Sequence, residues 1–191
     1  AGRCRRARGE FDRVALYIGR LAPHKNIPRL ISAFAASSFG GRAGRLILIG
    51  GSANERARLK RSTVMPYGVT IQALGPVSED ELDDLLARSM LLVMPSLEEG
   101  FGLPPFEAAA SGMPVVVSRT GAMGEIPPAN ATFCDPLSVD SIARAIDAAA
   151  ALEGAAPRLR HHGDLGLALG RAIGRVDRKS PRLNPKHLVN S

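Results

Sequence analysis

The sequence predicts an α/β fold, a doubly wound, parallel, six-stranded, Rossmann-like sheet. From Arg13 onward, short aliphatic runs alternate with longer segments of helical period, which is the pattern of a parallel sheet with crossover helices. The apolar runs are nearly continuous, which indicates strands buried on both faces. Right-handed crossovers then give a doubly wound sheet. A chain of 191 residues with 45% hydrophobic content suffices for one domain with a substantial core.

Six apolar runs predict the strands, because β-branched and aliphatic residues gather in buried strands. In chain order they are VALYIG (14–19), LILIGG (46–51), VTIQALG (69–75), MLLVMP (90–95), PVVVS (114–118) and the weaker ATFC (131–134). The glycines that close LILIGG either shape an anion-binding nest or simply end the strand.

Four helices have start or stop signals. Asn26 precedes apolar residues at helical spacing and can cap a helix. Ser78 and Glu81 form a capping box at the start of 78–89. The segment GLPPFEAAASG has prolines in a first turn and Gly112 at its stop. A fourth helix follows Ser138, with apolar residues on one face.

The chain divides into four predicted segments. Residues 1–12 are expected to be a linker remnant, and 13–155 the Rossmann-like domain. In 156–176 the pattern degrades into a single helical region with no following strand. Residues 177–191 have two prolines, high charge and no periodicity, so we expect disorder. This tail also resembles translated sequencing-adapter read-through, and we set it aside as non-native.

Charge and composition disfavour several functions. The net charge is +7, but residues 1–13 carry +3 and 157–191 carry +6, which leaves −2 for 14–156. With only 4% aromatic residues, no basic stripe with stacking rings is present for nucleic acid. Two Cys and four His have no metal-ligand spacing, so no metal site is predicted. No apolar run approaches the roughly 20 residues of a membrane span, which favours a cytoplasmic protein without membrane association.

The predicted sheet places a ligand site at the carboxyl ends of its strands, where the strand order reverses. For the dinucleotide-type order this point lies between the first and fourth strands. The loops to inspect are therefore GRLAPHKN, after the first strand, and PSLEEGFGLPP, after the fourth.

The first loop supplies Arg20 and Lys25, a bidentate fork and a mobile point charge that together suit a diphosphate. The second supplies Gly100 and Gly102 around Phe101, just before a helix. Glycines permit a tight turn there, and the helix N-terminus favours an anion. The alternative is two solvated cations, with His24 between them an exposed loop residue and Phe101 a packing residue.

Glu99 and Glu107 need another explanation, because a carboxylate pointed at phosphate would repel it. Flanking the anion site, they could accept paired hydrogen bonds from vicinal diols. A nucleotide sugar has two such diols, one on its ribose and one on its hexose. The alternative is a helix-terminal charge and a surface acid.

These segments resemble group 1, or family 4, retaining glycosyltransferases. The resemblance rests on GRLAPHKN, LILIGG, GPVSEDEL, PSLEEGFGLPPFEAAASGMPVVVS, GAMGEI and DPLSVDSIARAI, and covers roughly 13–152. The spacing from Glu99 to Glu107 is its most specific element. The resemblance implies the C-terminal, donor-binding half of a two-domain GT-B fold.

The resemblance also implies roles for single residues. Arg20 and Lys25 would hold the donor diphosphate and stabilise the leaving nucleotide, and Glu99 would contact hydroxyls of the transferred sugar. The backbone of Gly100, Phe101, Gly102 and Leu103 would contact the diphosphate or sugar. Glu107 would contact the ribose, and the loop ending at Val77 would lie near the base. Such enzymes generally need no metal or other cofactor. Their donor is a sugar linked to UDP, GDP or ADP. From the resemblance, we expect a mannosyl group from a GDP-linked donor.

The family's acceptor-binding N-terminal domain is not in this sequence, so we expect a fragment that binds donor but is inactive alone. Two alternatives are a non-catalytic nucleotide-binding module and a dinucleotide-dependent oxidoreductase domain. The second is disfavoured because no G-x-G-x-x-G follows the first strand, where Arg20 stands instead. Oligomeric state is not predicted.

Overall fold

A computed structural model describes residues 13–62, 69–99, 102–120, 122–125, 127–128 and 130–152. The predicted linker 1–12 and the segments 156–176 and 177–191 lie outside the described residues, as do Gly100 and Phe101. The described part forms one six-stranded sheet of order β3-β2-β1-β4-β5-β6, and every neighbouring pair is parallel. The predicted α/β doubly wound fold is confirmed.

All six predicted strands form, most of them one or two residues shorter than the apolar runs. Their bounds are β1 (Val14–Ile18), β2 (Arg45–Ile49), β3 (Thr70–Ala73), β4 (Leu91–Met94), β5 (Val115–Ser118) and β6 (Ala131–Cys134). β2 ends before Gly50, which has φ 101°, and an added Cβ there would lie 2.6 Å from the Gly19 carbonyl oxygen. This close approach of neighbouring loops explains why glycine follows the strand.

The helices alternate with the strands. Their bounds are η1 (Pro23–Lys25), α1 (Ile27–Ala36), α2 (Ser38–Gly41), α3 (Ala53–Ser62), α4 (Glu79–Arg88), α5 (Leu103–Ala110), α6 (Ala122–Glu125) and α7 (Val139–Ala151). No sequence signal identified α3, because it is mostly polar and lacks a broad apolar face, Leu59 being its buried residue in the described part. The capping box of α4 is confirmed, with the Glu81 N–H donating to Ser78 Oγ (3.3 Å) and the Ser78 N–H to Glu81 Oε2 (2.9 Å).

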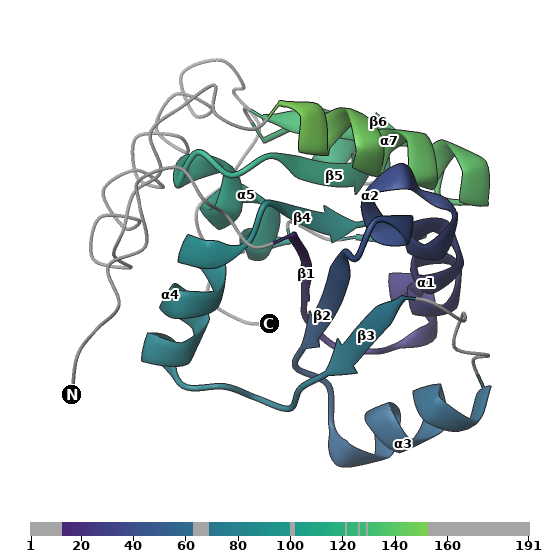
Figure 1. The fold of residues 1–191 in the computed structure, drawn as a ribbon, viewed down its shortest axis with the longest axis vertical. Helices are drawn as coiled ribbons and strands as arrows, with labels where there is room; N and C mark the ends of the chain where they lie inside the picture. The colour runs from purple at the N-terminus through teal and green to yellow at the C-terminus, as the bar shows by residue number, and fades with distance from the viewer. Residues whose placement is uncertain are drawn as a thin grey trace.

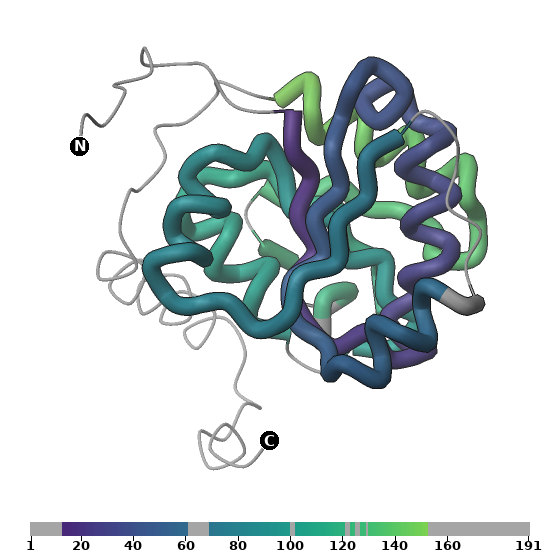
Figure 2. The backbone as a smooth tube through the Cα atoms, turned by 60° about the horizontal axis from the view of Figure 1, so that its bottom comes forward, coloured from purple at the N-terminus to yellow at the C-terminus, as the bar shows by residue number. Residues whose placement is uncertain are grey.

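Helices cover the sheet from both sides. Figure 1 shows α1, α2 and α7 on one side of the strands and α4 and α5 on the other. In Figure 2, β1, β2 and β3 run side by side between these two groups. Helices α1 and α7 pack on each other although they are far apart in the sequence. The sheet is therefore the middle layer of three, as the nearly continuous apolar strands predict.

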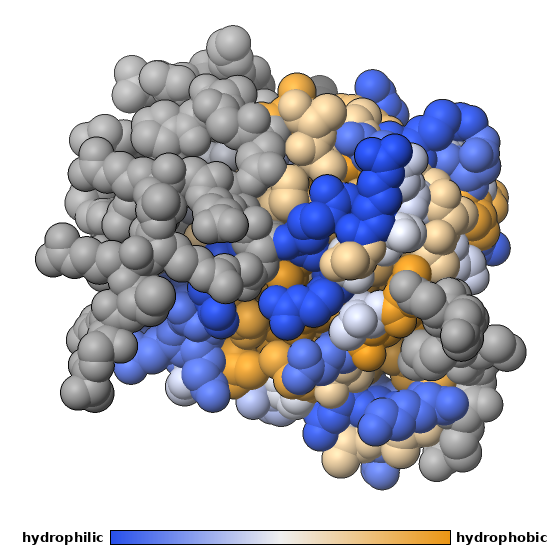
Figure 3. Space-filling view, in the orientation of Figure 1, coloured by the Kyte–Doolittle hydropathy of each residue, from blue (hydrophilic) through white to orange (hydrophobic). Residues whose placement is uncertain are grey.

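The core is made of the strands and the inner faces of α1 and α7. β1 and β4 lie at the centre of the sheet, and β4 and β5 are buried along their whole length. Figure 3 shows apolar surface between hydrophilic side chains near the middle of its described part. Helix α4 and the edge strand β3 are only half-buried, with Leu82, Leu85, Leu86, Ile71 and Ala73 packed against the core from outside.

Asn26 does not cap α1 in the way the sequence suggests. It occupies the N-cap position, but its side chain makes no capping hydrogen bond and its φ is 61°. Instead its Nδ2 donates to the carbonyl oxygens of Pro95 (2.9 Å) and Pro136 (2.7 Å), while its Oδ1 accepts from Arg29 (2.6 Å). The Asn26 amide therefore ties the β1–α1 loop to the loops after β4 and β6. Sequence alone could not identify these distant partners.

We expect Asn26→Asp to lower the free energy of unfolding by about 3 kcal/mol, because two carbonyl oxygens lose a donor and face a carboxylate. Asn130→Asp is the matched control, since the Asn130 Nδ2 donates to the Ala109 carbonyl oxygen over a long 3.5 Å. Urea unfolding followed by circular dichroism measures both. An equal decrease in the free energy of unfolding of both variants would contradict the proposed role of the Asn26 amide in tying the loops together.

Cys134 ends β6 as a buried thiol that donates to the Val117 carbonyl oxygen (3.5 Å). Burial, and secondly the Asp135 carboxylate, raise the pKa of Cys134 to about 12. Thiolate is the reactive form, so a thiol with this pKa stays protonated and inert at neutral pH.

We expect iodoacetamide at pH 8.5 to alkylate Cys134 at least 10-fold more slowly in the folded chain than in urea, where the thiol has its ordinary pKa near 8.5. Mass spectrometry of the Cys134 peptide over time gives both rates. Comparable rates in the two states would show that the thiol is not buried.

Candidate functional site

The candidate site lies where the strand order reverses. β1 pairs with β2 on one side and with β4 on the other, so the loops that follow β1 and β4 lie next to each other. A backbone hydrogen bond joins them, from the Leu97 N–H to the His24 carbonyl oxygen (2.8 Å). The two loops that the sequence singled out are therefore in direct contact.

A buried ion pair links the same two loops. Lys25 Nζ lies 2.7 Å from Glu99 Oε1 and 2.8 Å from Glu99 Oε2. The Lys25 side chain is 14% exposed and that of Glu99 is 9% exposed. The sequence analysis did not foresee this pairing of Lys25 with the acid of the neighbouring loop, and the role of Lys25 toward a diphosphate stays a prediction. Lys25, which was predicted to bind the diphosphate, and Glu99, which was predicted to bind the sugar, therefore bind each other in this structure.

Glu99 is also held from two further directions. Ser96 Oγ donates to Glu99 Oε2 (2.9 Å). Gly102, the N-cap of α5 with φ 55°, packs against its stem, and an added Cβ would lie 3.0 Å from Glu99 Cγ and 2.9 Å from Met123 Cε. Glycine is needed at position 102 both for its backbone conformation and for this close approach.

Arg20, unlike Lys25, has a mostly exposed side chain. Its side chain is 78% exposed, and its nearest acid is Glu55 of α3, with Arg20 Nε 3.6 Å from Glu55 Oε1. The Tyr17 hydroxyl donates to the Arg20 carbonyl oxygen (2.5 Å), which fixes the backbone while the guanidinium stays free to turn. Burial raises the pKa of Tyr17, with smaller contributions from Glu99 and Glu55, so its hydroxyl stays a donor.

Glu55 remains a carboxylate beside Arg20. The Ser52 N–H hydrogen bond, more than the charge of Arg20, lowers the pKa of Glu55. At an exposed pair of this length the attraction is weak, so an anionic ligand can compete for Arg20.

The remaining predicted site residues in the described part of the chain lie on α5 and just before α4. Leu103, its first residue, is 47% exposed, and Glu107 lies half-buried one turn further on. The Glu107 carboxylate makes no hydrogen bond or ion pair with another described residue. Val77, just before α4, packs at the edge of the core. The ligand roles of these residues stay predictions.

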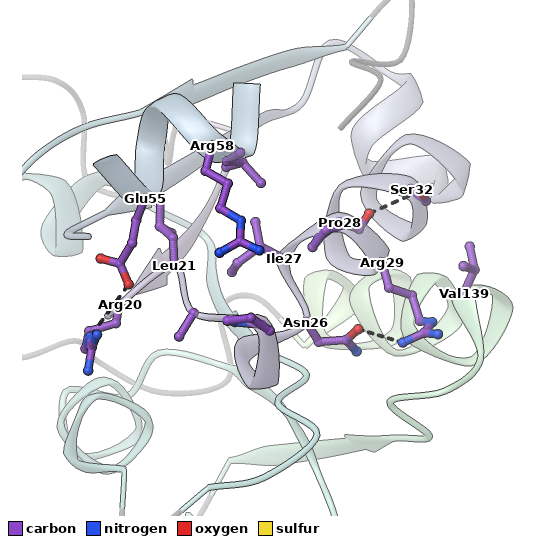
Figure 4. A pocket seen from close by; sticks show the side chains of 13 residues that line it. Arg20, Leu21, Asn26, Ile27, Pro28, Arg29, Ser32, Glu55, Arg58 and Val139 are labelled. Carbon is purple, nitrogen blue, oxygen red and sulfur yellow. Dashed lines mark hydrogen bonds and ion pairs between the residues drawn. The ribbon is translucent and has the colours of Figure 1, made fainter. Parts of the chain in front are cut away.

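A pocket of about 840 Å³ opens beside Arg20, between α1 and α3 (Figure 4). Figure 4 shows Arg58 pointing from α3 into the space between the two helices, and Arg29 bonded to Asn26 on the α1 side. Of the predicted site residues that the structure describes, Arg20 lines this pocket, and Lys25, Glu99 and Glu107 do not. The pocket residues are Arg20, Leu21, Ala22, Pro23, Asn26, Ile27, Pro28, Arg29, Ser32, Glu55, Arg58, Leu59 and Val139.

The described residues include no cluster of three or more His, Cys, Asp or Glu side chains suited to a metal ion. Within that same part of the chain, no helix is both long and apolar enough to cross a membrane.

Sequence reasoning missed three residues that shape the site. Ser96 donates a hydrogen bond to Glu99, and Glu55 forms an ion pair with Arg20. Asn26 had been assigned only a capping role. Ser96 precedes Glu99 by three residues, a spacing that allows a local contact, and this was the one usable signal. Glu55 is 35 residues from Arg20, so only the fold could show their contact.

Similar sequences include mannosyltransferases. The chain is 35% identical, over 149 residues, to a GDP-mannose-dependent alpha-(1-6)-phosphatidylinositol dimannoside mannosyltransferase of Mycobacterium tuberculosis, covering 75% of this chain and 38% of that protein. It is 33% identical over 133 residues to the O-antigen chain mannosyltransferase B of Escherichia coli, covering 67% of this chain and 34% of that protein. The chain thus spans little more than a third of each relative.

Similar solved structures are GT-B glycosyltransferases. Sucrose-phosphate synthase from Thermosynechococcus elongatus superimposes with a TM-score of 0.62 and 25% identity, covering 87% of this chain and 46% of that one. HepE from Anabaena, solved with UDP and glucose, has a TM-score of 0.61 and 21% identity, covering 87% of this chain and 44% of that one. At 21% identity, the similarity to HepE supports the fold of this chain and nothing more specific.

The family described as "Glycosyl transferases group 1" matches residues 5–163. This range contains the six strands and both loops of the site. The chain therefore belongs to the group 1 glycosyltransferases.

Proposed function

We propose that this chain is the donor-binding domain of a retaining glycosyltransferase, which binds a nucleoside diphosphate sugar and transfers its hexosyl group. The observation that carries the proposal is the meeting of the two loops at the strand-order reversal, with Lys25 on Glu99 and Arg20 exposed beside them. Retention of configuration is inferred from the resemblance of the Glu99–Glu107 element to retaining members of the family.

The diphosphate would lie between the β1–α1 loop and the start of α5. Arg20 can turn from Glu55 and offer a bidentate fork, because its guanidinium is mostly exposed. The N-terminus of α5 adds partial positive charge at Gly102 and Leu103, because the first N–H groups of a helix have no partner within the helix. Gly100 and Phe101 complete this loop in the sequence.

Lys25 and Glu99 would change partners when the donor arrives. A diphosphate competes with the Glu99 carboxylate for Lys25, and the released carboxylate oxygens can then accept hydrogen bonds from hexose hydroxyls. Glu107, which has no partner among the described residues, would accept from the ribose hydroxyls. Val77 would lie near the base.

The cations of the site can supply the charge stabilisation of the reaction. As the glycosidic bond breaks, negative charge grows on the diphosphate, and Arg20 and Lys25, once turned to the bound diphosphate, would stabilise it together with the α5 dipole. We therefore propose transfer without a metal ion or other cofactor. The chain contributes donor binding and leaving-group stabilisation, not proton transfer to the acceptor.

The donor is proposed to be GDP-mannose. The support is the set of similar proteins, which includes a GDP-mannose-dependent mannosyltransferase and further mannosyltransferases. UDP- and ADP-linked sugars are the alternatives. The acceptor would be bound by an N-terminal domain, since this chain spans 38% of the mycobacterial relative. We propose that this chain alone binds donor but does not transfer it.

Isothermal titration calorimetry with GDP, UDP, ADP and NADH tests the proposal. We expect the chain to bind GDP weakly, and Arg20→Ala to weaken binding about 10-fold because a charge-assisted hydrogen bond to phosphate is lost. Glu107→Ala should weaken binding by a similar factor, through the ribose. Arg20 is a cleaner probe than Lys25, whose removal would leave Glu99 buried and unpaired.

Arg144→Ala is the matched control, because Arg144 is also an exposed arginine paired with an acid, Asp140, but lies on α7. It should bind GDP as the unsubstituted chain does. NADH binding tighter than every nucleoside diphosphate would favour an oxidoreductase domain instead. If the Arg20 and Arg144 variants bind GDP with equal affinity, Arg20 does not take part in donor binding.

A further inference from the structure

Ser96 is a buried serine at the floor of the site. It is 1% exposed and lies in the loop after β4, three residues before Glu99. Its Oγ donates to Glu99 Oε2 (2.9 Å). No role was assigned to it by motif or by resemblance.

Ser96 is itself held in place by the next strand. Its carbonyl oxygen accepts from Ser118 Oγ (2.5 Å) and from Thr120 Oγ1 (3.3 Å), and these two hydroxyls lie 3.0 Å apart. Ser118 ends β5 and is 2% exposed. The rigid centre of the sheet is thereby connected, through two serines, to the carboxylate of Glu99.

The hydroxyl of Ser96 differs from those of the other buried serines. Ser37, Ser89, Ser111 and Ser118 each donate to a backbone carbonyl oxygen, the usual way to satisfy a buried hydroxyl. Ser96 donates to an ionised side chain that also contacts Lys25. A purely structural serine does not need this partner.

We propose that Ser96 is a positioning residue that holds the Glu99 carboxylate in place for the sugar of the donor, an inference that rests on the proposed function. In the free protein, Lys25 and Ser96 both bond to Glu99. When Lys25 turns to the diphosphate, the Ser96 hydrogen bond keeps the carboxylate in one orientation, and the lack of a side chain at Gly102 leaves room for it. A fixed carboxylate binds hexose hydroxyls without the entropic cost of ordering it.

The test separates the sugar from the rest of the donor. The affinities of GDP and GDP-mannose are measured by calorimetry, and their ratio is the contribution of the sugar. We expect Ser96→Ala to reduce that ratio about 10-fold, the effect of losing one hydrogen bond to a charged group, while GDP affinity changes less than 2-fold.

Ser89→Ala is the matched control, since Ser89 is also 1% exposed and its Oγ donates to the Leu85 carbonyl oxygen (2.6 Å), at the end of α4. It should leave both affinities unchanged. Thermal unfolding of both variants shows any general loss of stability. A Ser96→Ala variant that weakens GDP and GDP-mannose equally, or neither, would overturn the positioning role.

Glu99→Gln distinguishes this inference from the proposed function. If Glu99→Gln removes the sugar contribution and Ser96→Ala does not, the inference about Ser96 is wrong and the donor role of Glu99 stands. If neither variant changes the ratio while GDP still binds, the sugar contact assigned to Glu99 is wrong, and the role of Ser96 with it. A chain that binds neither ligand overturns both proposals.

Discussion

The buried pair of Lys25 and Glu99 is the interaction on which the rest of the site depends. The two side chains are mostly buried, which is costly for their charges unless the partner stays in place. The pair joins the two loops that carry the predicted anion and sugar ligands. It therefore links the two loops, and under the proposed function a donor would have to offer each charge a new partner.

The surroundings of this pair explain its geometry. Asn26 ties the first loop to the loops after β4 and β6, and Ser96 and Gly102 hold Glu99 from two sides. Arg20 is the exception, because it is exposed and only loosely paired with Glu55. The site thus combines a preorganised floor with one adaptable cation at its edge, an arrangement that suits a flexible, highly charged ligand.

The fold could be predicted because its signals are local. Continuous apolar runs identified all six strands, and the capping box of Ser78 with Glu81 placed α4 correctly. Helix α3 was missed because its mostly polar residues carry little periodic apolar signal. Membership of the group 1 glycosyltransferases agrees with the motif between Glu99 and Glu107, which depends on spacing within a single loop and helix.

By itself, the sequence determined the six strands, the doubly wound fold class, the loops to inspect after the first and fourth strands, and the residue types suited to a diphosphate and to sugar hydroxyls. The strand order itself comes from the structure. Only the tertiary structure decided how those residues pair. Lys25 and Glu99 are 74 positions apart, and Asn26 and Pro136 are 110 apart, so no local pattern encodes their contacts. A side chain chooses its partner by distance and burial in the folded chain, and these are set by packing across the sheet rather than by spacing along the sequence.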